Sequence, residues 1–147
     1  MSDDAVALQT LDDSIRYYRE DYIDGLSQGW ERYFGLAYGL AAQSRAALHL
    51  GQTDLAVASC REALTWASRK RIDAFALLGL IAAAEIEWSA GNTDRAIVLT
   101  ALVASHPHTF AADRAEAQHL LNAFGAQPDL TLPPPDLWET VRDLLES

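Results

Sequence analysis

The chain contains one short pattern twice, as GQTDLAVASC at Gly51–Cys60 and as GNTDRAIVLT at Gly91–Thr100. Each copy has the form Gly-x-Thr-Asp-x-Ala followed by a largely apolar run, and the two glycines stand 40 positions apart (91 − 51). Glycine commonly ends a helix, and Thr or Asp commonly caps the next one. Each copy therefore predicts a tight turn between two antiparallel helices, with its Thr or its Asp capping the second helix.

The rest of the chain has the spacing of apolar residues that is typical of helices, without the alternation that indicates strands. We expect a single all-α domain over residues 1–147, with about seven helices as stacked antiparallel hairpins and a C-terminal capping helix. The expected helices span about 8–22, 30–50, 55–68, 72–90, 95–105 and 110–124, and a short last helix begins near Asp136. The domain divides into an N-terminal helix in 1–28, hairpins in 29–70 and 71–108, and C-terminal helices in 109–147 with a Pro-rich connector at 125–135.

Two glycines, Gly35 and Gly39, lie inside the second expected helix and are followed by four alanines, at Ala41, Ala42, Ala46 and Ala47. Each glycine costs a helix interior roughly 1 kcal/mol relative to Ala. This cost makes sense where a neighbouring helix needs the space of the missing side chain. The pair therefore predicts a very close helix–helix contact.

Composition excludes several classes of protein. A formal net charge of −10 and a pI near 4.6 oppose contact with phosphate backbones, so no nucleic-acid partner is expected. The N-terminus MSDDAVALQT lacks a basic segment and an apolar core, and the chain has no run of about 18 uncharged apolar residues, so neither a signal peptide nor a membrane partner is expected. The single cysteine, Cys60, fits a reducing compartment, and we predict a cytoplasmic protein in which Cys60 is a small buried hydrophobe.

The two repeated blocks resemble a known family of helical repeats. AALHLGQTDLAVASCREAL, with a small residue, Gly, an acidic turn, Ala56 and Ala63-Leu64, resembles the second half of a tetratricopeptide repeat, and IEWSAGNTDRAIVLTALVA resembles the same unit. The period is 40 rather than about 34. Ala47 and Glu87 stand where the family usually has an aromatic residue, and no Pro follows the first block. These longer units, with LTALVASHPHT and LWETVRDLL, are similar to C-terminal repeat regions of bacterial multidomain signalling NTPases and transcriptional regulators.

The resemblance implies a non-enzymatic protein–protein interaction module of a bacterial signalling or regulatory system, which binds a partner protein or peptide or self-associates as a homo-oligomer. In such hairpins the first helices line a concave groove. By position, the resemblance places eight residues in that groove: Tyr38, Ala42, Arg45, His49, Leu78, Ala82, Glu85 and Trp88. Arg45 would face an acidic peptide. If the last helices fold over the groove instead, Leu78 and Trp88 become ordinary core residues. The alternative function is a small-molecule-sensing domain with a ligand pocket between helices.

No catalytic motif, cofactor-binding loop or clear metal-ligand set is present, so no catalytic residue, cofactor or metal is expected. Two weaker patterns remain. His106 and His108, with His119 further on, offer three imidazoles, against the simpler interpretation that His106 caps a helix and His108 is solvated. The segment Glu20–Glu31 partly fits a calcium loop but supplies too few oxygen ligands. The basic cluster Arg69–Arg71 falls at an expected helix C-terminus, where cations are favourable.

Overall fold

The computed structural model describes residues 3–21, 30–128 and 132–147, and within these ranges the chain is all-α. The described residues form seven α-helices and one π-helical turn, and no strand occurs among them. The elements are α1 (Asp3–Arg16), the π-helical turn Tyr17–Asp21, α2 (Trp30–His49), α3 (Thr53–Lys70), α4 (Asp73–Ser89), α5 (Thr93–Ser105), α6 (Ala111–Ala123) and α7 (Leu137–Glu146). The predicted helices are thus confirmed. The first begins at Asp3 rather than near Leu8 and continues into the π-helical turn, and the ends of the others differ by at most two residues.

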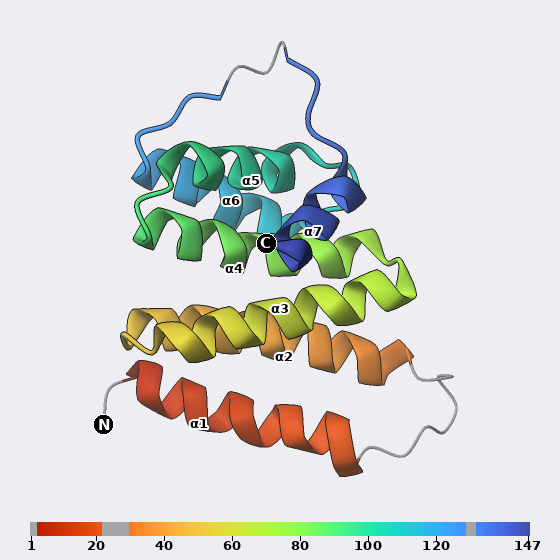
Figure 1. Cartoon of the computed structure of the whole chain (residues 1–147). Helices are drawn as coiled ribbons and strands as arrows, with labels where there is room; N and C mark the ends of the chain where they lie inside the picture. The colour runs from red at the N-terminus through yellow and green to blue at the C-terminus, as the bar shows by residue number, and fades with distance from the viewer. Residues whose placement is uncertain (1–2, 22–29, 129–131) are drawn as a thin grey trace.

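The helices stack in chain order, from α1 at one end to α5 and α6 at the other (Figure 1). The pairs α2–α3 and α4–α5 are antiparallel hairpins, and they pack on each other through α2, α3 and α4. The helix α1 packs on α2, and α6 packs on α5 and α4. The predicted arrangement of stacked hairpins is confirmed.

The repeated pattern forms two turns with the same geometry. Gly51 has a φ of +76° and Gly91 a φ of +87°, which is the left-handed conformation that glycine adopts without strain. In the first turn the Gly51 N–H donates to Leu48 O at 3.0 Å and the Gln52 N–H to Ala47 O at 2.8 Å. Equivalent bonds join the second turn at 3.1 and 2.9 Å. Both turns therefore end their first helix with a Schellman motif.

The predicted capping residues are wrong by one or two positions. The residues before the second helices are Gln52 and Asn92, and neither makes a side-chain capping hydrogen bond. Thr53 already lies in the first turn of α3, as Thr93 does in α5. The reason is that the Schellman motif closes so tightly that the next helix begins at once. Asp136, in contrast, is the predicted N-cap of α7, and its carboxylate accepts the Glu139 N–H at 2.9 Å.

A third turn of the same kind follows α6, which the sequence pattern did not indicate. Gly125 has a φ of +68°, and its N–H donates to Asn122 O at 3.0 Å while the Ala126 N–H donates to Leu121 O at 2.9 Å. This glycine stands 34 positions after the second turn glycine (125 − 91). No Thr-Asp-x-Ala follows it, and the chain continues into the Pro-rich connector. The helix α6 is therefore the first half of a hairpin without its second helix.

The close contact predicted at Gly35 and Gly39 is confirmed, and the neighbouring helix is α1 with its π-helical turn. A Cβ placed on Gly35 would lie 2.5 Å from the Tyr18 ring, and one on Gly39 would lie 3.0 Å from Ile15 Cγ1. A third such place is Gly79 in α4, where a Cβ would lie 2.6 Å from Leu64 Cδ2 of α3. The missing side chains let successive layers approach closely.

The last helix, α7, folds back across the stack and packs on α3 and α4 (Figure 1). Leu137, Val141 and Leu144 join the main hydrophobic core there. The Arg61 guanidinium of α3 donates to the carbonyl oxygens of Leu144 and Leu145 at the C-terminal end of α7. None of the helices in the described ranges is long and apolar enough to cross a lipid bilayer.

Candidate functional site

The eight residues predicted for the groove lie on α2 and α4, which pack side by side. Tyr38 is 54% exposed, and His49 is also exposed. Ala42, Arg45 and Trp88 are half-buried. The other three residues are buried: Leu78, Ala82 and Glu85. A partner would therefore meet the α2 residues, with the α4 residues beneath them.

The helix α7 does not fill this face. It packs along α3 and on the part of α4 that carries Ala83 and Glu87, which are turned away from Ala82 and Glu85 on the helix circumference. It is α6 that approaches the face. We call the surface formed by α2, α4 and α6 the first-helix face, because each of these helices precedes a turn glycine.

A charged network joins the three helices of the first-helix face. Arg45 on α2 donates through Nε to Glu85 Oε1 on α4 at 2.6 Å, and through Nη2 to Glu116 Oε1 on α6 at 2.6 Å. His49 Nε2 lies 3.1 Å from the other oxygen of Glu85. The structure thus brings three predicted residues together and adds Glu116. No local sequence pattern marked Glu116, because only the packing of α6 brings it to Arg45.

The charged groups in and beside this network are mostly acidic, and the pKa values of Arg45 and Asp113 are shifted. Burial by itself lowers the pKa of Arg45, but the charges and hydrogen bonds of Glu85 and Glu116 outweigh burial and raise it. Burial raises the pKa of the Asp113 carboxyl on α6, and Glu116 raises it further, while Arg45 only partly offsets them. Arg45 lowers the pKa of Asp113 more than Glu116 raises it, so the net rise comes from burial. With Glu85, Glu116 and Asp113 beside one Arg45, the formal charges of the patch are net negative. This patch can favour an additional cation.

Aromatic side chains flank the network. At one end, exposed Tyr38 stacks on Phe34 with ring centroids 6.0 Å apart, and Phe34 lies 6.3 Å from the ring of Phe110 at the start of α6. At the other end, Trp88 stacks on Phe124 at 4.1 Å with the rings 13° from parallel. The first-helix face therefore has an exposed aromatic side chain at the Tyr38 end, and its Trp88 end is closed by Phe124.

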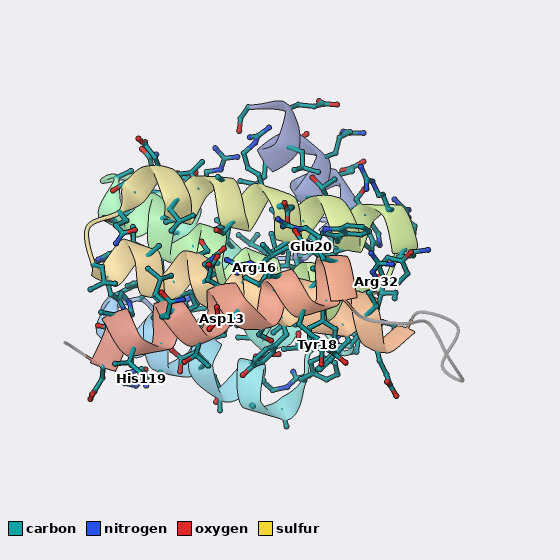
Figure 2. All side chains as sticks on the ribbon, turned by 90° about the horizontal axis from the view of Figure 1, so that it is seen from below. Asp13, Arg16, Tyr18, Glu20, Arg32 and His119 are labelled. Atoms are coloured by element: carbon teal, nitrogen blue, oxygen red, sulfur yellow. The ribbon has the colours of Figure 1, made fainter. Side chains whose placement is uncertain are left out.

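The histidine cluster forms with a different third member from the one considered in the sequence. His106 and His108 meet Asp73 at the start of α4, and the ligand atoms of these three residues lie within 4.8 Å of one another. His119 lies elsewhere, exposed on α6 (Figure 2). His108 Nδ1 lies 2.7 Å from Asp73 Oδ2, and His106 Nε2 lies 4.0 Å from the same oxygen.

The hydrogen bonds around this cluster do not suit a metal ion. The His108 backbone N–H donates to His106 Nδ1 at 3.1 Å, so in neutral His106 the proton is on Nε2, the atom that faces Asp73. A metal on Nε2 would need the opposite tautomer and would break this bond. The carboxylate of Asp73 also accepts the Trp138 Nε1–H at 3.0 Å. The cluster instead ties α4, the α5–α6 connection and α7 together.

The remaining sequence features have structural roles where the structure describes them. The predicted burial of Cys60 is confirmed, and burial raises the pKa of its thiol to about 12, which leaves it unreactive. The basic cluster lies at the end of α3, and each of its cations sits over an aromatic ring: Arg69 over Trp66, Lys70 over Tyr33 and Arg71 over Trp138. Most of the partial calcium-loop pattern, residues 22–29, lies outside the described residues.

Comparisons of the chain with protein families, with curated proteins and with solved structures find no match.

Proposed function

We propose that this protein is a non-enzymatic protein–protein interaction module built from tetratricopeptide-like hairpins, and that it binds a partner segment on its first-helix face. The proposal includes a cytoplasmic setting in a bacterial signalling or regulatory system, as the resemblance of the repeated blocks implies. The single observation that carries it is the arrangement around Arg45: a charged network across three helices next to the exposed ring of Tyr38. Aromatic side chains beside a few charged groups are typical of peptide-binding surfaces.

The charge of the network selects the chemistry of the partner. The guanidinium of Arg45 is engaged by Glu85 and Glu116, so it offers little to an acidic peptide. One guanidinium, that of Arg45, stands against the three carboxyl groups of Glu85, Glu116 and Asp113, so the formal charge of the face is acidic there. The partner segment is therefore basic, with Lys or Arg at the acidic patch and an apolar residue at Tyr38. This reverses the acidic partner that the sequence alone suggested for Arg45.

The first test compares binding of basic and acidic peptide libraries by fluorescence anisotropy. Tyr38→Ala should weaken the best basic binder about tenfold or more, because exposed aromatic side chains supply much of the energy at such surfaces. Val98→Ala is the matched control, since Val98 is an exposed apolar residue on α5, outside the first-helix face. A preference for acidic peptides, or equal effects of the two variants, would contradict the proposal.

A second variant separates binding from folding. Asp113→Asn should weaken a basic peptide yet make the protein more stable at pH 7. The pKa of Asp113 is raised by folding, so its ionised form costs stability above the unfolded pKa, and this cost vanishes below it, where both states are protonated. The melting temperature of the variant should therefore exceed that of the wild type at pH 7 and converge with it in acid. A variant that lowers both stability and binding would indicate a structural role only.

A further inference from the structure

The stack of hairpins is incomplete at the α6 end. Ser44, Ala84 and Gln118 stand at the same distance before the three turn glycines. Ser44 and Ala84 are completely buried, since α3 and α5 cover them, whereas Gln118 is exposed. The difference follows from the connector, which leaves Gly125 without forming a second helix. The face of α6 that a second helix would cover is therefore open.

This open face is part of a groove between α5 and α6. The groove has a volume of about 570 Å³ and includes Gln118, Leu121 and Asn122 of α6. Ala101, Ala104 and Ser105 of α5 form its other wall. Small and uncharged side chains dominate, as they do where α3 crosses α2. The groove has the composition of a helix-binding surface.

At the α1 end, α1 packs on α2 like the second helix of a hairpin, and no described helix packs on it as the first helix. Gly39 and Gly79 stand at the same distance before their turn glycines, so they are equivalent positions of α2 and α4. Ile15 of α1 packs on Gly39, and Leu64 of α3 packs on Gly79. The helix α1 therefore packs on α2 in the same way as α3 packs on α4, and Ile15 is equivalent to Leu64.

This alignment identifies the face of α1 that lacks a partner helix. Counting back from Ile15 and Leu64 pairs Ala7, Thr10 and Ser14 of α1 with Ala56, Ser59 and Ala63 of α3. The α3 residues are at most 3% exposed because they face α2.

The two equivalent sets differ sharply in burial. At the α3 set, Ser59 donates to Gln43 of α2 at 2.8 Å, and Ser44 of α2 donates to Ala56 O at 2.6 Å. In α1, Ala7 and Thr10 are exposed and Ser14 is half-buried. Seen from this end of the molecule, α1 is the outermost element (Figure 2).

We propose that copies of this chain associate head to tail, with the exposed face of α1 from one copy docking in the α5–α6 groove of the next. The contact continues the α2–α3 interface that already exists within each chain, with Gln118 in the place of Ser44. Each copy presents one surface of each kind, so the association is heterologous and extends the stack of hairpins. It uses the ends of the stack and does not depend on a partner at the first-helix face.

The two ends of the stack are complementary, because α1 packs like a second helix and α6, among the described helices, lacks one. This favours a second copy of the chain over an unrelated helix. Within the described part of the chain, α1 lacks a first helix on its exposed face and α6 lacks a second helix, so together these two helices supply both halves of one more hairpin. The side chains at the centre of the contact, Ala7, Thr10, Ser14 and Gln118, are uncharged. The net charge of −10 on each copy opposes association. The association should therefore become stronger as added salt screens this repulsion.

Sedimentation velocity over a wide range of protein concentrations tests this proposal. The wild type should show species larger than a monomer at high concentration and moderate salt. Thr10→Arg should weaken the association about a hundredfold or more, because it places an unpaired charge in the contact. Gln9→Arg is the matched control: its α3 equivalent, Ala58, is exposed, so this variant adds the same charge outside the contact. Circular dichroism should show all variants folded.

Mixing two defective variants gives the decisive measurement. Thr10→Arg keeps an intact α5–α6 groove, and Gln118→Arg keeps an intact α1 face. Each variant alone should be monomeric, while the mixture should form one-to-one heterodimers and nothing longer. A wild type that stays monomeric at the highest concentration, equal effects of Gln9→Arg and Thr10→Arg, or a mixture that stays monomeric would each overturn the proposal. Peptide binding at the first-helix face is measured separately, so either proposal can fail alone.

Discussion

At the scale of single residues, the absence of a side chain sets how closely the layers of this protein pack. Gly39 admits Ile15, and Gly79 admits Leu64, at equivalent places in successive layers. Each glycine carries the entropic cost that is usual in a helix. The cost is offset because an apolar side chain of the neighbouring helix packs where the Cβ would stand.

Gly79→Ala is therefore expected to destabilise the protein, although Ala is the better helix former. The added Cβ would lie 2.6 Å from Leu64 Cδ2, and Leu64 is itself buried with little room to move. Overpacking of this kind costs about 1–3 kcal/mol. Urea denaturation measures the loss. Leu64→Ala should cost less in the Gly79→Ala background than in the wild type, and simple additivity of the two would contradict this explanation.

Asp73 makes the stability of the folded state depend on pH, with a sign opposite to that expected for Asp113. Burial tends to raise the pKa of Asp73, but hydrogen bonds from His108 and Trp138 and the nearby histidine charges lower it overall from 3.8. A lowered pKa stabilises the folded state above pH 3.8, and this contribution is lost as the pH falls through the folded value. Asp73→Asn should thus lower the melting temperature at pH 7 and converge with the wild type in strong acid. A constant difference at every pH would argue against this role.

At the scale of elements, α7 packs its apolar side chains into the core and makes polar contacts at its two ends. Trp138 at its start donates to Asp73 and lies under Arg71, and Arg61 of α3 binds the carbonyl oxygens at its end. These carbonyls have no further helical turn to bond them, so the half-buried guanidinium of Arg61 satisfies them and complements the helix dipole. The apolar face of the short helix lies between these two anchors.

Arg61→Ala should loosen the C-terminal end of α7 without unfolding the hairpins. Hydrogen bonds from a charged donor are worth about 1.5–3 kcal/mol, and partial exposure of this site places the loss near the lower end. Hydrogen exchange should become faster in α7 and stay unchanged in α2. Arg142→Ala is the control, because Arg142 is exposed on α7. Similar exchange in the two variants would show that Arg61 does not anchor the helix.

At the scale of the whole molecule, the net charge of −10 on 147 residues makes self-repulsion a general cost of compactness. Added sodium chloride should raise the melting temperature, since screening reduces this repulsion over distances of about 10 Å at 0.1 M. Differential scanning calorimetry at low and moderate salt measures the change, with sucrose of equal osmolality as the control. A melting temperature that falls with salt would mean that the ion pairs of the Arg45 network dominate instead.

The sequence by itself determined the helices and two of the three described glycine turns, those at Gly51 and Gly91, because helices and turns depend on neighbours in the chain. Apolar spacing marked each helix, and a glycine that can adopt positive φ ended it. The same local reasoning predicted the close contact at Gly35 and Gly39 from the cost of the glycines alone. It failed at Gly125, where the Thr-Asp pattern is absent although the backbone hydrogen bonds are the same.

Only the tertiary structure decided which charges meet and which faces stay open. Arg45 and Glu116 are 71 positions apart, and Asp73 and His108 are 35 apart, so the crossing of helices brings them together. The same packing leaves Gln118 exposed where Ser44 is buried, although the two positions are equivalent in the repeat. Local propensity fixes the course of the backbone, whereas burial and ion pairing depend on the elements that happen to lie opposite.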